Sequence, residues 1–178
     1  ASRSWGNYSF YLGASHDNLA EIQSVDRQQV CGVKVFMGAS TGDLLVDNPV
    51  ALDNIFRECP ILIATHCEDS RVIAANLARI EQQYGVALGA EFHPLIRDEA
   101  ACYASSSYAV ALAKKYRSQL HVLHLTTAKE LALFSDLPLS QKHITAEVCV
   151  HHLRYSAEDY ARLGNLLKCN PAVKSLAD

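Results

Sequence analysis

The sequence predicts an α/β fold in which parallel strands alternate with covering helices. Short apolar runs of strand length recur along the 178 residues, and longer stretches with helical spacing separate them. Strands joined through helices pair in parallel, because each connection has to cross back over the sheet. No linker, repeat or low-complexity tract interrupts the pattern, so residues 1–178 are expected to form a single domain. Both a doubly wound sheet and a (β/α) barrel fit this pattern.

The strands are predicted from five apolar runs, and the helices from the stretches between them. The runs cover residues 8–12, 32–37, 61–65, 120–125 and 144–150, with 166–169 as a further extended piece. The predicted helices cover residues 17–29, 49–58, 70–84, 98–116, 129–135 and 157–163. Asp47 or Asn48 is the expected N-cap of the second helix, and Gly85 can end the third.

Composition and sequence motifs argue against several functional classes, among them nucleic-acid-binding, membrane-spanning and nucleotide-binding proteins. A formal charge of −3 gives no basic footprint, so nucleic acid is not an expected partner. No apolar run is long enough to cross a bilayer, and no signal-peptide pattern follows the first residues. The six cysteines form no C-x-x-C pair and are expected to be reduced thiols of a cytoplasmic protein. No glycine-rich dinucleotide or P-loop fingerprint follows a strand.

The informative feature is a set of polar residues at the ends of predicted strands. Lys34 lies inside an apolar run, His66 and His124 end the next two, and His151 and His152 follow the fifth. Each alone is more often a hydrogen-bonded structural residue than a ligand. Together they point to one site, because active sites form at the carboxyl ends of parallel strands.

The remaining histidines are interpreted as structural or surface residues. His121 is expected to point away from its strand neighbours, and His16, His93 and His143 are expected in loops or on the surface.

A buried lysine beside two imidazoles suits metal chemistry. A lysine whose pKa is lowered by burial can react with carbon dioxide, and the resulting carbamate has two oxygens that can bridge two divalent metals. Neutral imidazole is a common zinc ligand. Two such metals would activate water at neutral pH and polarise an amide carbonyl.

Five segments of the chain resemble dihydroorotase, a family of the amidohydrolase superfamily. They are residues 32–42 (Gly-Val-Lys-Val-Phe-Met-Gly-Ala-Ser-Thr-Gly), 65–68 (Thr-His-Cys-Glu), 121–127 (His-Val-Leu-His-Leu-Thr-Thr), 147–153 (Glu-Val-Cys-Val-His-His-Leu) and 168–171 (Lys-Cys-Asn-Pro). They occur in the family's order and span nearly the whole chain. The set is shared with allantoinases and hydantoinases, and the last two segments favour dihydroorotase among them.

The resemblance implies a TIM (β/α) barrel with two zinc ions in a complete site. Lys34 matches the carboxylated lysine that bridges the metals, and His66 and His124 match the two histidines that bind the second metal. Asn170 matches a residue that contacts the substrate, and His152 has a supporting role behind the ligands. Gly38 and Ser40 are expected to shape the loop above the metals.

Two departures from the family pattern limit what this chain is expected to do. Nothing matches the His-x-His metal ligands of the first barrel strand. Neither Asp136 nor Asp178 stands in the context of the acid/base aspartate of strand eight, so no catalytic residue is assigned within the chain. By this alignment the chain runs from about barrel strand two to just after strand six. We therefore expect a partial barrel with parallel strands and outer helices, inactive by itself.

The implied function is the reversible hydrolysis of dihydroorotate to N-carbamoyl-aspartate in pyrimidine biosynthesis. The partners would be this small-molecule substrate and further copies of the chain in a homo-oligomer. An allantoinase or a hydantoinase (dihydropyrimidinase) is one alternative, with the same metals and another ring. A non-catalytic, oligomeric amidohydrolase-like domain is the other.

Overall fold

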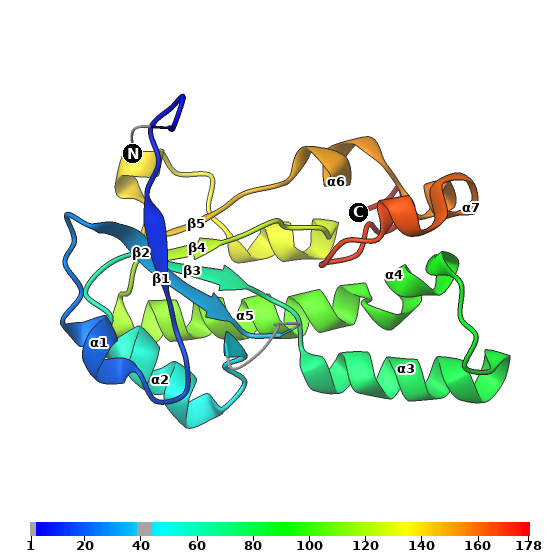
Figure 1. Ribbon diagram of the computed structural model, residues 1–178, viewed down its shortest axis with the longest axis horizontal. Coiled ribbons are helices and arrows are strands. Elements are labelled where there is room, and N and C mark those ends of the chain that lie inside the picture. Colours follow the sequence, from blue (N-terminus) through cyan, green and yellow to red (C-terminus); the bar gives the residue numbers. More distant parts are fainter. Residues whose placement is uncertain (1–2, 39–43) are drawn as a thin grey trace.

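The computed structural model describes residues 3–38 and 44–178, and its centre is a five-stranded parallel sheet (Figure 1). The strands are β1 Phe10–Gly13, β2 Val30–Phe36, β3 Ile63–His66, β4 Leu120–Val122 and β5 Ile144–Ala146. All neighbouring pairs are parallel, and the order in the sheet is the order in the chain. A doubly wound sheet would reverse direction at a switch point. The unbroken order is that of a partial (β/α) barrel, as the sequence predicted.

Most of the predicted helices form, and their ends follow local capping signals. The α-helices are α1 Leu19–Gln23, α2 Pro49–Glu58, α3 Ser70–Tyr84, α4 His93–Ile96, α5 Glu99–Tyr116, α6 Val150–Arg154 and α7 Tyr160–Leu163. Short 3-10 segments are η2 Ala90–Phe92, η3 Ala128–Leu133, η4 Leu139–Gln141, η5 Ala157–Asp159 and η6 Gly164–Leu167. The Asn48 side chain accepts hydrogen bonds from the first backbone N–H groups of α2, which decides between the two predicted caps. Gly85 ends α3 with a φ of 84°, a conformation that favours glycine.

Three predictions of secondary structure were wrong near the carboxyl end, and one helix is shorter than predicted. The strand predicted to reach Val150 stops at Ala146, because Val150 begins α6. Residues 166–169 are not extended, since η6 occupies most of them, and residues 128–133 form a 3-10 segment in place of an α-helix. The helix predicted over 17–29 is reduced to α1. Val150 is 80% exposed, so its apolar character reflects no burial in a sheet.

The two faces of the sheet differ in chemistry. Val33, Val35, Ile63, Leu120 and Val122 are at most 1% exposed and belong to the core cluster with residues of α2 and α5. In Figure 1 the helices α1, α2 and α5 lie along this side of the sheet. Side chains alternate between faces along a strand, so the residues between these form the opposite face. One cross-strand row of that face contains Lys34, Ala64, His121 and Thr145.

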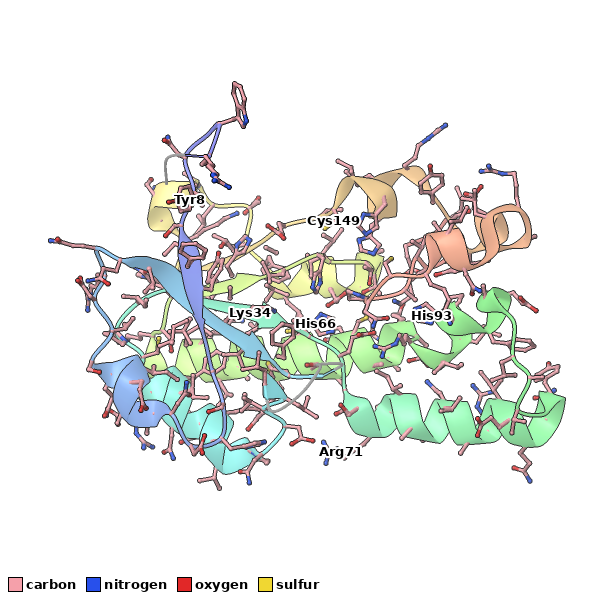
Figure 2. All side chains as sticks on the ribbon, in the orientation of Figure 1. Tyr8, Lys34, His66, Arg71, His93 and Cys149 are labelled. Atoms are coloured by element: carbon pink, nitrogen blue, oxygen red, sulfur yellow. The ribbon has the colours of Figure 1, made fainter. Side chains whose placement is uncertain are left out.

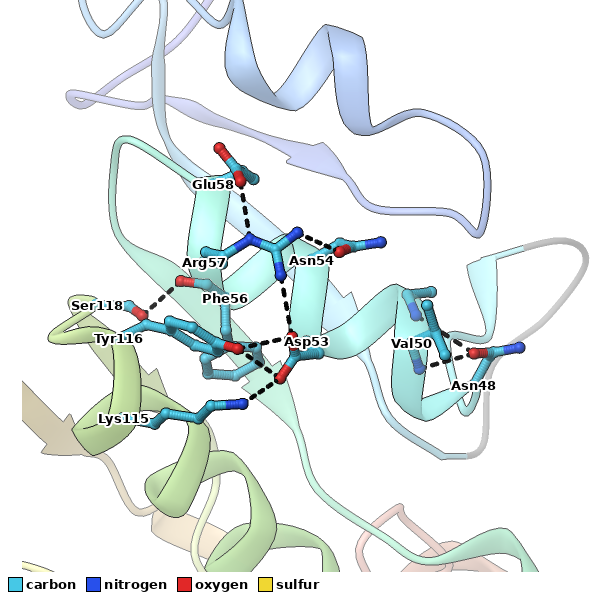
Figure 3. A network of polar contacts seen from close by, with 11 residues as sticks. Asn48, Val50, Asp53, Asn54, Phe56, Arg57, Glu58, Lys115, Tyr116 and Ser118 are labelled. Carbon is cyan, nitrogen blue, oxygen red and sulfur yellow. Dashed lines mark hydrogen bonds and ion pairs between the residues drawn. The ribbon is translucent and has the colours of Figure 1, made fainter.

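The helices α2 and α5 are joined by a polar network as well as by the core (Figure 3). Asp53 of α2 accepts hydrogen bonds from Lys115 Nζ at 2.8 Å and from the Tyr116 hydroxyl at 2.7 Å. Ser118 Oγ donates to the carbonyl of Phe56 at 2.7 Å. These contacts fix the carboxyl end of α5 and therefore the start of β4, which follows it.

A second, smaller core lies at the carboxyl end of the chain. Tyr160, Leu167 and Val173 pack with Ala90 of η2, which ties the last segment back to the middle of the sequence. Within the described part of the chain, no helix combines the length and the apolar character that a membrane span requires.

Candidate metal centre

Lys34 lies in the middle of β2 with its amine in an unusual environment. The amine nitrogen is buried and has no hydrogen-bond partner among residues 3–38 and 44–178. It lies 4.1 Å from the centroid of the Phe36 ring. Burial lowers the pKa of Lys34 to about 8, and negative charge from Cys67 and Glu147 opposes this only in part. A substantial neutral fraction of the amine is therefore present near neutral pH.

His66 and His124 face each other at the ends of neighbouring strands. His66 ends β3, His124 follows β4, and His66 Nδ1 lies 3.1 Å from His124 Nε2. Two imidazole ligands of one tetrahedral zinc would be about 3.3 Å apart, given a Zn–N distance of about 2.0 Å. Nitrogen atoms this close must share either a proton or a cation. The pair therefore has the spacing of two ligands of one metal.

His124 is held as a neutral imidazole in a strained backbone conformation. Burial, with the charges of His66 and Lys34 acting in the same direction, lowers the pKa of His124 to about 3. Its Nδ1 is buried without a partner in the described part of the chain. The φ of His124 is 41°, a left-handed conformation that non-glycine residues seldom adopt and that concentrates at functional sites. Lys34 and His66 lie on the neighbouring strands β2 and β3, as Figure 2 shows.

The orientation of His66 is set by a buried carboxylate. Its Nε2 lies 2.9 Å from Glu68 Oε2, and Arg97 donates to the same oxygen. Burial raises the pKa of Glu68, but the hydrogen bond from His66 and the charge of Arg97 outweigh this and leave it lowered. An ionised Glu68 only accepts, so His66 Nε2 carries the proton and Nδ1 presents its lone pair to His124. Carboxylates commonly orient metal-binding histidines in this way.

Sequence reasoning assigned no role to Glu68, Arg97 or Lys174. The position of Glu68 two residues after His66 was the one available signal. Lys174 is 6% exposed and donates to Thr126 Oγ1 at 3.3 Å and to the Ala172 carbonyl at 2.9 Å. Its charge lowers the pKa of both Glu68 and His152. Arg97 is 29 residues from Glu68 in sequence and Lys174 is 48 residues from Thr126, so only folding makes these contacts.

The other predicted site residues are His152 and Asn170. His152 is in α6 and does not directly follow the fifth strand, which corrects the prediction for it and for its neighbour His151. Its Nε2 lies 3.1 Å from the Pro171 carbonyl oxygen, and its supporting role behind the ligands stays a prediction. Asn170 is exposed, and its role as a substrate contact stays a prediction.

The predictions for Gly38, Ser40, His93 and His121 have different outcomes. Gly38 is buried, and a Cβ placed there would lie 2.0 Å from the carbonyl oxygen of Glu68. Ser40 lies outside the described residues. His93 is not a surface residue as predicted, because it is half-buried and its Nε2 donates to the Cys169 carbonyl at 2.8 Å. His121 Nδ1 lies 2.8 Å from Thr145 Oγ1, which agrees with a structural role.

The residues present fit part of a metal site. Lys34 and His124 offer buried nitrogen atoms without partners, and His66 offers a nitrogen oriented by a carboxylate. Buried polar atoms are normally paired, so these nitrogen atoms keep the capacity to bind a cation or, for Lys34, to form a carbamate.

Comparison with known proteins identifies the same class of protein. Over 173 residues, 93% of the chain, the sequence is 25% identical to a dihydroorotase of Methanothermobacter thermautotrophicus. The chain is related to the cyclic amidohydrolases of the amidohydrolase superfamily. An allantoinase of Deinococcus radiodurans is 26% identical to the chain over 180 residues, 96% of the chain. No protein family model matches it.

Solved structures share the fold of the chain. An L-hydantoinase (dihydropyrimidinase) from Arthrobacter aurescens superimposes on 94% of the chain with a TM-score of 0.81 at 23% sequence identity. A dihydropyrimidinase from Brevibacillus agri NCHU1002 gives 0.81 over 95% of the chain at 21% identity. The chain covers 36% of the dihydroorotase, 39% of the allantoinase and 38% of each structure, well under half of these proteins.

Proposed function

We propose that this chain supplies the middle of a two-metal site in a hydrolase that opens a cyclic amide, with dihydroorotate as the substrate. The observation that carries the proposal is the facing pair of His66 and His124, 3.1 Å apart, beside the strand β2 whose Lys34 amine is buried and has no partner in the described part of the chain. Strand ends from three successive strands contribute, as in barrel enzymes.

Lys34 has the chemistry that the bridging position needs. In its neutral form the amine nitrogen attacks carbon dioxide, a nitrogen–carbon bond forms and one proton is released. The product is a carbamate anion, whose two oxygens are hard donors suited to two cations. Burial favours the neutral amine at the start, and bound cations would then stabilise the anion that forms.

The imidazoles of His66 and His124 would hold one of the two cations. Zinc in such a site lowers the pKa of bound water and polarises a carbonyl oxygen. The contribution of this chain is to fix the ligands: Glu68 holds the tautomer of His66, and Arg97 keeps Glu68 ionised. Removing such a supporting residue typically costs 10- to 100-fold in metal affinity, as an order of magnitude.

The substrate is proposed from the motifs around the site. A dihydroorotase and allantoinases are similar to the chain at nearly equal identity, so overall similarity does not choose between them. The Cys-Val-His-His-Leu segment at 149–153 and the Lys-Cys-Asn-Pro segment at 168–171 support dihydroorotate. Allantoin and hydantoin are the substrates of the alternative proposal.

The test uses the longer zinc-loaded protein that contains this chain. We expect hydrolysis of dihydroorotate in preference to allantoin and hydantoin. Lys34→Ala should lower kcat/KM more than about 100-fold and reduce the zinc content, because the bridging group is lost. Lys114→Ala removes an exposed lysine of α5 and should change neither. Full activity with unchanged zinc in the Lys34→Ala protein would refute the assignment of Lys34 as the bridging ligand. Turnover of allantoin alone would show that allantoin, and not dihydroorotate, is the substrate.

A further inference from the structure

A second group of metal-ligand side chains lies at the start of α6. Cys149, His151 and His152 each offer one ligand atom, and these atoms lie within 4.8 Å of one another. Across the described ranges 3–38 and 44–178, this is the one group of three His, Cys, Asp or Glu side chains with ligand atoms so close. It shares no residue with the pair formed by His66 and His124.

The local backbone explains why the three side chains converge. Cys149 is the N-cap of α6 in an extended conformation, and its side chain makes no capping hydrogen bond. The chain then turns directly into the helix, so positions two and three residues further on return toward the cap. The rings of His151 and His152 are 4.2 Å apart between centroids. Val150, between them and the cysteine, is 80% exposed and points away.

His152 already has the tautomer that a ligand needs. Its Nε2 lies 3.1 Å from the carbonyl oxygen of Pro171. A carbonyl only accepts, so Nε2 carries the proton and Nδ1 keeps its lone pair. That Nδ1 is buried and has no partner in the described part of the chain. A histidine ligand whose other nitrogen donates to a backbone carbonyl is the usual arrangement at metal sites.

The donor set selects the class of ion. One thiol and two imidazoles suit a borderline-soft divalent cation such as zinc or cobalt and do not suit magnesium or calcium, which prefer oxygen. Cys169 is not part of this donor set, because its Sγ lies 3.7 Å from Nε2, the nitrogen of His152 that donates to Pro171. Three protein ligands would leave one position of a tetrahedron open.

We propose that Cys149, His151 and His152 form a binding site for one zinc-class cation, distinct from the centre formed by Lys34, His66 and His124. The inference does not depend on that centre, since it uses none of its ligands, and its residues enter the proposed function only through the motif at 149–153 that supports the substrate. The site would tie the start of α6 to the segment that follows η6, because the Pro171 carbonyl orients one of its ligands.

Cobalt titration of the 178-residue chain tests the proposal, because of the two proposed metal sites only this one has a thiol among its ligands. We expect a thiolate-to-cobalt charge-transfer band in the near ultraviolet, which a site of imidazoles and lysine cannot give. Cys149→Ser should abolish the band and lower the bound cobalt by one equivalent. Cys31→Ser is the matched control, because Cys31 is an exposed thiol on β2, and it should leave the band unchanged.

Further variants separate the two sites and guard against misfolding. The double variant His66→Ala/His124→Ala should keep the band. His151→Ala should keep the thiolate band but weaken cobalt binding at least about tenfold. The far-ultraviolet circular dichroism of every variant should match that of the unsubstituted chain. No band in the unsubstituted chain, or a band that survives Cys149→Ser and is lost in Cys169→Ser, would overturn the proposal.

Discussion

The amine of Lys34 destabilises the chain when no metal or carbamate is present. Its nitrogen is buried without a partner in the described residues, and burial lowers its pKa from 10.5 to about 8. Below pH 8 the folded and unfolded chains both carry the charge, and the folded chain bears the full desolvation cost. Between pH 8 and 10.5 the unfolded chain binds a proton that the folded chain does not, so stability rises with pH. Strain of this kind is typical of residues kept for function.

We therefore expect Lys34→Met to stabilise the metal-free chain. The gain in the free energy of unfolding should be about 2–3 kcal/mol at pH 7, because the shift corresponds to a few kcal/mol of differential solvation. It should shrink steadily from pH 8 to 10. Urea unfolding of carbonate-free protein at several pH values measures this, with the exposed Lys114→Met as control. A gain that does not vary with pH would contradict the electrostatic explanation.

The close approach of β2 and β3 at their carboxyl ends positions the carboxylate behind His66. Gly38 follows β2, and Glu68 follows β3 by two residues. The two backbones touch so closely that a Cβ at position 38 would collide with the Glu68 carbonyl at 2.0 Å. A glycine is therefore required here by packing, and not by an unusual φ. The contact couples the end of one strand to a group that orients a ligand on the next.

Gly38→Ala should weaken both the fold and the metal centre. We expect a loss of about 1–3 kcal/mol in the free energy of unfolding, because the backbone has to move to accept the methyl group. Zinc affinity should fall as well, since Glu68 moves with its backbone. Gly6→Ala is the control, because nothing lies within 4 Å of a Cβ at that position. Urea unfolding and zinc titration measure the two effects. An unchanged free energy of unfolding and an unchanged zinc affinity would show that the backbone at position 38 accepts the methyl group without cost.

The sheet as a whole has two outer strands, β1 and β5, each paired on one side within the described part of the chain. Tyr8, Phe10 and Tyr11, in or beside β1, are 45–66% exposed. Unpaired strand edges with exposed apolar side chains promote association between chains. Among residues 3–38 and 44–178, no layer of long helices comparable to α2 and α5 covers the face that carries Lys34 and His121 (Figure 1). Both features fit a sheet that needs further structure to complete it.

We expect the 178-residue chain alone to associate as its concentration rises. Tyr8→Lys with Phe10→Lys should shift the mass toward the 19.5 kDa of one chain, because lysines at a strand edge oppose edge-to-edge pairing. Leu166→Lys, at an 90% exposed position in η6, should have little effect. Light scattering over a concentration series measures this. A single-chain mass at every concentration for the unsubstituted protein would show that the edges do not pair.

The sequence by itself determined that the strands are parallel, where the helices α2 and α3 lie, and which residues are candidate metal ligands, namely Lys34, His66 and His124. These depend on signals that are local, namely apolar periodicity, caps such as Asn48 and polar residues at the ends of apolar runs.

Only the tertiary structure decided what surrounds those candidates. Arg97 reaches Glu68 across 29 residues, and Lys174 reaches Thr126 across 48, with no pattern in the sequence to mark either contact. The same holds for α6: an apolar run continues past Ala146, but the chain leaves the sheet there, because burial depends on neighbours that are distant in sequence. Local patterns specify which residues can form an element, whereas packing decides where it ends and which side chains meet.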